Sequence, residues 1–105
     1  MRELQHPPLD DVCLSAVFNA LSDPIRLSVV RRLSDDGELC CNELEMPVSK
    51  SSMSHHFRVL REAGLTRTRI AGTRHYLTLR RDDVDRRFPG LLDTVLPLIE
   101  VPVPA

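Results

Sequence analysis

Apolar side chains recur at helical spacing early in the chain, and this stripe predicts an amphipathic helix over residues 9–21. Asp23 and Pro24 then form a helix start, because the carboxylate caps free N–H groups and proline fits the first helical position. A second helix is therefore expected to run to about Leu33. Its arginines are expected largely on the outer face: Arg26, Arg31 and Arg32.

Two further helices are expected before the middle of the chain ends. The first is short and covers residues 38–45, since Pro47 removes an N–H and limits any extension. Ser49 is a natural N-cap for the next helix, and Gly64 supplies the left-handed residue that ends it. The apolar positions expected to face inward from this helix are Met53, Phe57 and Leu60.

After Gly64, apolar and polar residues no longer recur at helical spacing and instead alternate along the chain. Residues 65–70 and 75–79 predict two strands joined by a tight turn. A last helical region is expected from Asp82, interrupted at 88–90 and resumed through 91–99. The predicted fold class is mainly α with a small β-hairpin (α+β).

At 105 residues the chain is expected to form a single small domain over residues 9–100, with a flexible arm at 1–8 and a disordered tail at 101–105. A core of this size is thin, so pairing with a second copy is expected. No apolar run approaches the roughly 20 residues that cross a bilayer, and the N-terminus does not resemble a signal peptide. No membrane association and a cytoplasmic location are therefore expected.

Candidate chemistry is sparse. Cys13, Cys40 and Cys41 are odd in number, so they do not form a disulfide framework. Ser54, His55 and His56 are neighbours on one helical turn and point in different directions, which excludes an aligned nucleophile, base and orienting group. We therefore expect no enzyme activity.

Charge is strongly segregated along the chain. Residues 50–81 contain eight basic residues and one acid, a net charge of +7, whereas residues 1–49 carry −5 and residues 82–105 carry −3. The overall net charge of −1 conceals this polarity. A basic segment on an otherwise acidic domain indicates a face that binds a polyanion.

Four motifs resemble those of the ArsR/SmtB family of bacterial winged-helix repressors. They are Ala20-Leu21-Ser22-Asp23-Pro24-Ile25-Arg26-Leu27, Ser51-Ser52-Met53-Ser54-His55-His56-Phe57, Leu60-Arg61-Glu62-Ala63-Gly64-Leu65 and Gly72-Thr73-Arg74-His75-Tyr76. The resemblance implies a winged helix-turn-helix domain, a homodimer joined through first and last helices, and a palindromic double-stranded DNA operator. The residues expected at the dimer interface are Leu9, Val12, Val17, Leu91, Leu92, Val95, Leu96 and Ile99.

The basic segment supplies the candidate DNA contacts. Short hydroxyls at a helix N-terminus can approach phosphates and base edges closely. The candidates on the helix are Lys50, Ser51, Ser52, Ser54 and His55, with Arg58 and Arg61 as phosphate contacts, and those on the hairpin are Arg67, Arg69 and Arg74. His56 lies near the apolar stripe and is expected to pack inward with one ring nitrogen satisfied.

The family resemblance also implies an inducer, usually a metal or metalloid ion. Cys40 matches the first cysteine of a thiol box in the third helix, but Asn42 occupies the second position and Cys41 falls between. Cys13 of either subunit is the candidate third thiolate for a transition-metal or metalloid effector. No cofactor is certain, and an unknown or absent inducer is the favoured reading.

An alternative class stays open: a winged-helix interaction module. Its apolar C-terminal helix would recruit a protein partner, and tight DNA binding would require that partner.

Overall fold

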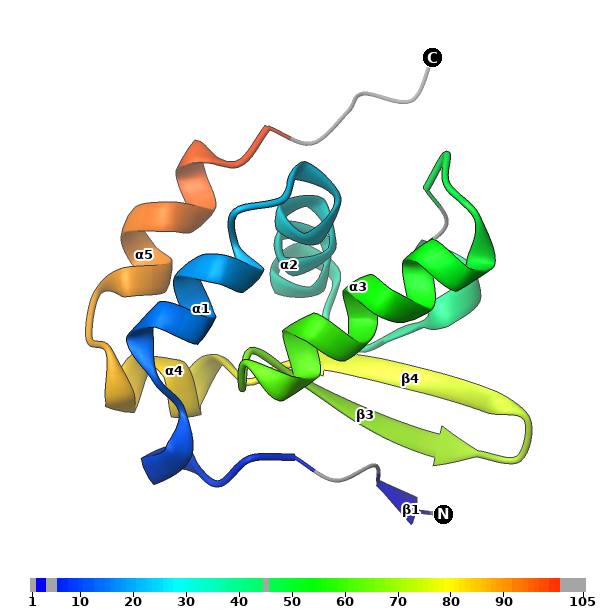
Figure 1. The fold of residues 1–105 in the computed structure, drawn as a ribbon, viewed down its shortest axis with the longest axis horizontal. Coiled ribbons are helices and arrows are strands. Elements are labelled where there is room, and N and C mark those ends of the chain that lie inside the picture. Colours follow the sequence, from blue (N-terminus) through cyan, green and yellow to red (C-terminus); the bar gives the residue numbers. More distant parts are fainter. Residues whose placement is uncertain (1, 4–5, 45, 101–105) are drawn as a thin grey trace.

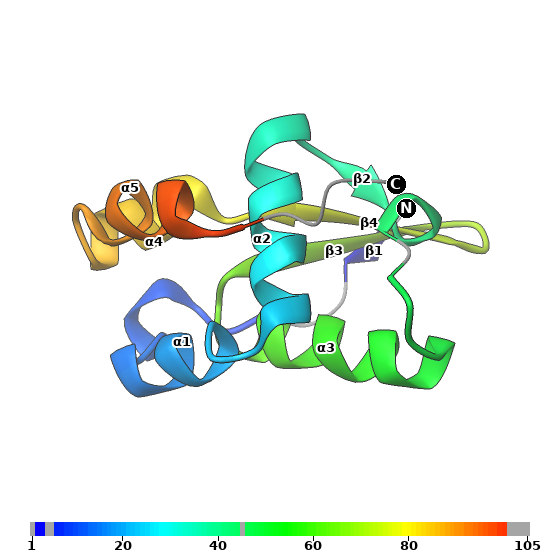
Figure 2. The same cartoon turned by 90° about the horizontal axis from the view of Figure 1, so that it is seen from above.

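The computed structural model describes residues 2–3, 6–44 and 46–100. The helix α3 (Lys50–Glu62) crosses one face of a hairpin formed by β3 (Thr66–Ala71) and β4 (Arg74–Leu79) (Figure 1). The hairpin turn forms one end of the molecule, and the C-terminal helices extend from the opposite end (Figure 2). No helix among the described residues is both long and apolar enough to cross a membrane.

The first helix is shorter than the sequence predicted. A 3-10 turn, η1 (Leu9–Asp11), precedes α1 (Leu14–Ala20), and the two residues between them are extended. Val12 causes this break, because its side chain is buried beside the backbone of Gly64 and the chain extends to place it there.

The second predicted helix is confirmed as α2 (Pro24–Asp36). The Asp23 carboxylate accepts hydrogen bonds from the N–H groups of Ile25 at 2.8 Å and Arg26 at 3.1 Å. These two bonds satisfy free donors at the helix start, as the Asp-Pro pair predicted.

The expected third helix is wrong in its first half, and its second half forms a 3-10 turn and not an α-helix. Leu39 and Cys40 form a short strand, β2, whose partners are Leu77 and Tyr76 of β4, and only a 3-10 turn, η2 (Cys41–Leu44), follows. Both strand residues are buried. Burial of consecutive side chains together with pairing to a sheet edge outweighs weak local helix propensity.

The predicted helix after Ser49 and the predicted hairpin are confirmed. The Ser49 hydroxyl caps α3 by accepting from Ser52 N at 3.1 Å, and Gly64 follows the helix with φ 86°. The strands β3 and β4 pair antiparallel, and Gly72 lies in their turn. The sheet order is β1-β3-β4-β2.

The segment expected as a flexible arm, 1–8, is described at residues 2–3 and 6–8. Residues Arg2–Glu3 form strand β1, paired antiparallel with β3. The His6 Nε2 atom accepts from Thr68 N at 2.8 Å, and Arg80 donates to the Pro7 carbonyl at 2.9 Å. These contacts hold residues 2–3 and 6–7 in place, and β1 covers an edge of β3 that would otherwise be unpaired. The predicted disordered tail, 101–105, lies outside the described residues.

The C-terminal region contains α4 (Arg81–Arg87), α5 (Leu91–Val95) and a 3-10 turn, η3 (Leu96–Leu98). Its apolar stripe faces the chain's own core. Five of the eight predicted dimer-interface residues are consequently buried within the single chain: Val12, Val17, Leu92, Leu96 and Ile99. This part of the prediction is corrected, because side chains packed inside one domain present no surface to a second copy. The other three are half-buried: Leu9, Leu91 and Val95.

Candidate nucleic-acid interface

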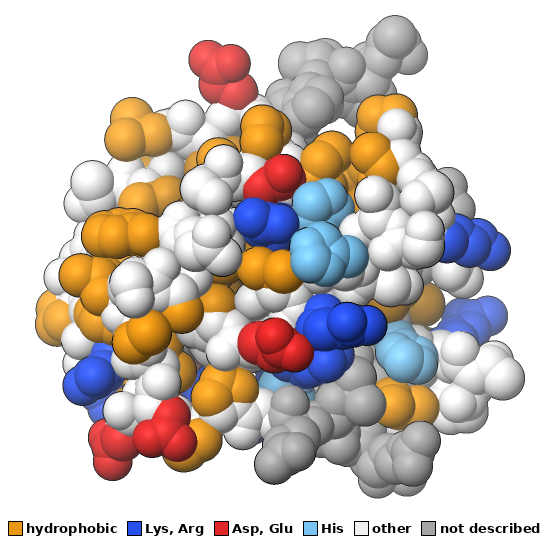
Figure 3. Space-filling model, viewed as in Figure 1, with side chains coloured by type: hydrophobic (Ala, Val, Ile, Leu, Met, Phe, Trp, Pro, Cys, Tyr) orange, Lys and Arg blue, Asp and Glu red, His pale blue; other side chains and the backbone are white. Residues whose placement is uncertain are grey.

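The outer face of α3 is polar and basic. Its inner face is anchored by Met53 and Leu60, which are buried as predicted, with Phe57 partly buried beside them. The exposed candidates on this helix are Lys50, Ser51, Ser54, His55 and Arg58, and the half-buried ones are Ser52 and Arg61. Figure 3 shows histidine and several Lys or Arg side chains over α3 and the hairpin, whereas hydrophobic side chains gather over α1 and α5.

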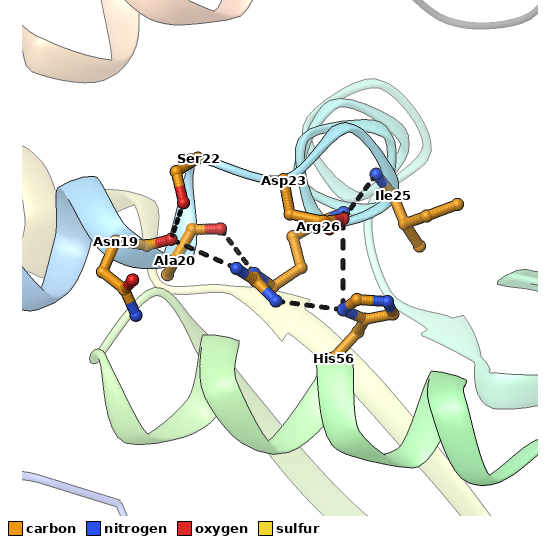
Figure 4. A network of polar contacts seen from close by, with 7 residues as sticks. All are labelled: Asn19, Ala20, Ser22, Asp23, Ile25, Arg26 and His56. Atoms are coloured by element: carbon orange, nitrogen blue, oxygen red, sulfur yellow. Dashed lines mark hydrogen bonds and ion pairs between the residues drawn. The ribbon is translucent and has the colours of Figure 1, made fainter.

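A buried arginine connects the middle of α3 to the end of α1 and the start of α2 (Figure 4). Arg26 is only 9% exposed and donates through Nε to the Ala20 carbonyl at 2.8 Å and through a terminal nitrogen to the Asn19 carbonyl at 3.2 Å. Its other terminal nitrogen lies 3.0 Å from His56 Nδ1. The prediction that Arg26 faces outward is therefore wrong, since its donors are satisfied inside the fold.

The same contact assigns a role to one ring nitrogen of His56. A guanidinium has donors only, so Nδ1 is the acceptor in this hydrogen bond. The expectation of a packed histidine with one satisfied ring nitrogen is confirmed. The network joins the end of α1 and the start of α2 to α3 and so holds α3 in position.

Asp23 completes this network. Its Oδ1 lies 4.0 Å from His56 Nδ1 and caps α2 at the same time. Partial burial acts to raise the pKa of the Asp23 carboxyl, but hydrogen bonds from Arg26 and Ile25 and nearby positive charge lower it below its ordinary value of 3.8 overall.

Two of the three hairpin arginines have acidic partners. Arg67 lies 3.2 Å from Asp83, and Arg69 lies 2.5 Å from Glu38 with its guanidinium 4.5 Å above the Tyr76 ring. Both arginines alternate with the buried Thr66 and Thr68, so they leave the sheet on the opposite face. The sequence did not reveal these partners, because Glu38 and Asp83 are distant along the chain. Arg74, beside the turn, is exposed.

A groove of about 770 Å³ lies between α3, η2 and the hairpin. Its apolar lining includes Leu44, Met53, Phe57 and Leu77. Sequence reasoning missed this groove; the only available signal was the set of apolar residues between Leu44 and Met53, a segment without regular spacing.

The three cysteines differ in environment. Cys13 is exposed, and a hydrogen bond with Ser15 lowers the pKa of its thiol. Burial raises the pKa of Cys41 to about 11, and the neighbouring Cys40 thiol adds to the effect. Within the described ranges, no three His, Cys, Asp or Glu side chains gather in a way that could hold a metal ion. The described part of one chain thus does not bring the three candidate thiolates into one site.

Comparison with known proteins gives consistent matches. Residues 21–69 match a family model described as a helix-turn-helix domain. The chain is 42% identical over 89 residues to YceK, an HTH-type transcriptional regulator of Bacillus subtilis, covering 82% of this chain and 89% of that protein. It is also 39% identical over 74 residues to the arsenical resistance operon repressor of Staphylococcus xylosus, covering 69% and 70%.

Solved structures agree. An ArsR family transcriptional regulator matches with a TM-score of 0.67 at 26% identity, covering 77% of this chain and 90% of that one. HlyU from Vibrio cholerae matches with a TM-score of 0.62 at 28% identity, covering 76% and 88%. The predicted winged helix-turn-helix architecture is confirmed, and the relatives are transcriptional regulators rather than enzymes.

Proposed function

Because the chain belongs to the ArsR/SmtB family of helix-turn-helix transcriptional regulators, we propose that it represses transcription as a homodimer bound to a palindromic operator. The observation that carries the proposal is the exposed face of α3. Lys50, Arg58, Arg61 and Arg74 form no ion pair with any described residue, so their charges are available to a polyanion.

The contacts divide by chemistry. The N-terminal residues of α3 enter the major groove, where Ser51, Ser54 and His55 meet base edges or phosphates. Arg58 and Arg61 lie further along the helix and take phosphates, as does Arg74 beside the hairpin turn. Arg67 and Arg69 contribute less, because each already neutralises a carboxylate.

The dimer half of the proposal rests on a surface that only partly overlaps the one the sequence indicated. Leu14 and Phe18 are one helical turn apart on α1 and are 44% and 52% exposed, and Leu98 of η3 is 76% exposed. These three large apolar side chains, with the half-buried Leu91 and Val95 nearby in sequence, supply an apolar surface that a second copy would cover. Figure 1 shows α1 and α5 on the same side of the molecule.

An ion effector would have to be shared between subunits. Cys13 of one chain would join Cys40 and Cys41 of the other, since no single chain gathers three ligands among its described residues. The Cys41 thiol must lose its proton to bind an ion, and its raised pKa makes that step costly. Relatives named for arsenical and cadmium resistance support testing this route.

The test is fluorescence anisotropy of purified, reduced protein on the DNA upstream of its own gene, against random DNA, at two salt concentrations. Tight, salt-sensitive and sequence-specific binding is expected, and adding zinc, cadmium or arsenite asks whether an ion releases the DNA. Cys40→Ser is the matched variant for any ion response. Binding no tighter than to random DNA under every condition would contradict the stand-alone repressor and favour the module that requires a protein partner.

A further inference from the structure

The groove beside α3 has the dimensions of a small-molecule site. Its volume of about 770 Å³ lies within the range of roughly 300–1,000 Å³ that ligand pockets occupy. The accessible apolar part of its lining comes from Met46, Val48 and Phe57, of which Val48 is 39% exposed and the other two are half-buried. Accessible apolar side chains in a groove of this size suit the apolar part of a ligand.

Cations line the same groove. Lys50, Arg58, Arg61 and Arg74 all contribute to it, and none has an ion-pair partner among the described residues. Elsewhere the chain pairs its arginines: Arg80 and Arg81, for example, each meet aspartates. The charge that would complement this groove is therefore negative.

A buried hydroxyl supplies an independent sign of a missing partner. Thr68 is 3% exposed and lines the groove, and its Oγ1 atom is buried without a hydrogen-bond partner. An unsatisfied buried hydroxyl is unfavourable, so a ligand atom that bonds to it would recover that free energy. Thr66 is also buried with an unpartnered hydroxyl, but it does not line the groove.

DNA accounts for only part of this lining. Phosphates complement the arginines, but a sugar-phosphate backbone offers no apolar body for Met46, Val48 and Phe57 and does not require Thr68. We propose that the groove between α3 and the hairpin binds a small organic carboxylate with an apolar body and a hydrogen-bonding group. The carboxylate meets the cations, the body covers the apolar lining, and the hydrogen-bonding group meets the Thr68 hydroxyl.

Such a ligand competes with the operator. Arg58, Arg61 and Arg74 line the groove and are also the phosphate contacts of the proposed function, on which this regulatory part of the inference rests. A bound carboxylate neutralises these cations and places an apolar body against α3. Occupancy is therefore expected to weaken DNA binding.

The binding experiment uses 6-hydroxy-2-naphthoate, a fluorescent carboxylate with a hydroxyl at the opposite end of its ring system. The chain has no tryptophan and one tyrosine, so the probe's emission is read against a weak background. Saturable binding to the free, unmodified protein is expected. The hydroxyl-free probe 2-naphthoate is expected to bind about three- to tenfold more weakly, the range for one neutral hydrogen bond.

Paired variants locate the probe. Thr68→Val should remove the difference between the two naphthoates, whereas the matched Thr66→Val should preserve it. Arg61→Gln should weaken both probes about tenfold or more by removing a charged hydrogen-bond donor, and Arg86→Gln, on the exposed surface of α4, should not. Circular dichroism on each variant verifies that it is folded.

Three outcomes would overturn the inference. They are no saturable binding of either probe up to about 1 mM, binding unaffected by both Thr68→Val and Arg61→Gln, and binding lost instead with Phe18→Ser on the exposed patch of α1. DNA competition is measured separately by anisotropy. Failure of operator binding in ligand-free protein contradicts the proposed function, while failure of probe binding to DNA-free protein contradicts only this inference.

Discussion

At the scale of single residues, two arginines among the described residues are buried, and their guanidinium N–H groups donate to backbone carbonyls. Arg26 bonds to the carbonyls of Asn19 and Ala20, and Arg80 bonds to the carbonyl of Pro7 and to Asp83. A planar guanidinium suits this task, because its five donors spread in a fixed fork. Both arginines join segments that are distant from each other in sequence.

The three hydrogen bonds of the Arg26 guanidinium lead to a specific prediction. Arg26→Lys should lower the free energy of unfolding by about 2–3 kcal/mol, since an ammonium cannot reach two carbonyls and His56 together. Urea denaturation followed by circular dichroism measures the change. The matched Arg86→Lys, at an exposed position, should fall within about 0.5 kcal/mol of the wild type. Equal effects of the two substitutions would contradict the assigned role.

The Asp23 cap should make stability depend on acid. Its pKa is lowered in the folded chain, so the carboxylate stabilises the fold above its ordinary pKa of 3.8, and this contribution is lost as pH falls through the folded pKa. Asp23→Ala should cost about 1 kcal/mol at neutral pH, whereas Asp23→Asn keeps a cap. Denaturation at neutral and acidic pH should show that the free energy of unfolding falls less on acidification for Asp23→Asn than for wild type. An equal fall would mean that a group other than Asp23 is responsible.

At the scale of elements, the helix starts are set by residues close in sequence, whereas strand β2 is set by contacts with residues distant in sequence. Asp23-Pro24, Ser49 and the glycine after α3 are local signals, and both helices begin where these residues predicted. The strand β2 has no local signal, because its pairing with β4 and its burial are set by the tertiary fold. A helix was therefore predicted at Leu39–Cys40 and a strand formed.

The junction after α3 provides a test at this scale. Gly64 has φ 86°, and a Cβ there would overlap Val12 Cγ2, whereas Gly72 has φ 62° with open space around it. Gly72→Ala should cost about 1 kcal/mol through backbone strain alone. Gly64→Ala adds a clash in the core and should cost about 1–3 kcal/mol more. Thermal or urea unfolding of the two variants compares them, and equal losses would exclude the proposed contact with Val12.

At the scale of the whole molecule, the basic segment is not uniformly available to DNA. Acidic residues of the flanking segments fold back onto part of it: Glu38 pairs with Arg69, and Asp83 pairs with Arg67. Burial acts to raise the pKa of Asp83, but Arg80 and then Arg67 hold it below its ordinary value overall. The effective cationic surface is therefore narrower than the net charge of residues 50–81 suggests.

Salt dependence measures that difference. Arg74→Ala should reduce the slope of log K against log salt by about one, because it removes one phosphate contact. Arg69→Ala should change the slope less, since its guanidinium is paired with Glu38 and lies over Tyr76. Anisotropy titrations across several salt concentrations give both slopes. A larger change for Arg69→Ala would reverse the assignment of these two residues.

The exposed apolar side chains Leu14, Phe18 and Leu98 lead to a prediction about self-association. Phe18→Ser should weaken self-association at least about tenfold, because each subunit loses a large apolar contact. Val48→Ser is the matched control, as Val48 is 39% exposed but lies in the segment that borders the groove. Sedimentation equilibrium measures both. A dimer unaffected by Phe18→Ser would move the interface away from α1.

The candidate site was predicted in its parts and not in its arrangement. Periodicity placed Lys50, Ser54 and Arg58 on the outer face of α3, since a helix of known phase has a known outer face. The acid partners of Arg67 and Arg69 and the network at His56 join residues far apart in sequence, and no local pattern encodes them.

The sequence by itself determined the starts of α2 and α3, the hairpin and the charge polarity, because caps, glycines and periodicity act within a few residues. Tertiary structure alone decided that Arg26 is buried, that β2 is a strand, that the C-terminal stripe faces inward and that a groove opens beside α3. These features depend on surfaces that meet only after folding, where burial and hydrogen-bond satisfaction outweigh local preference.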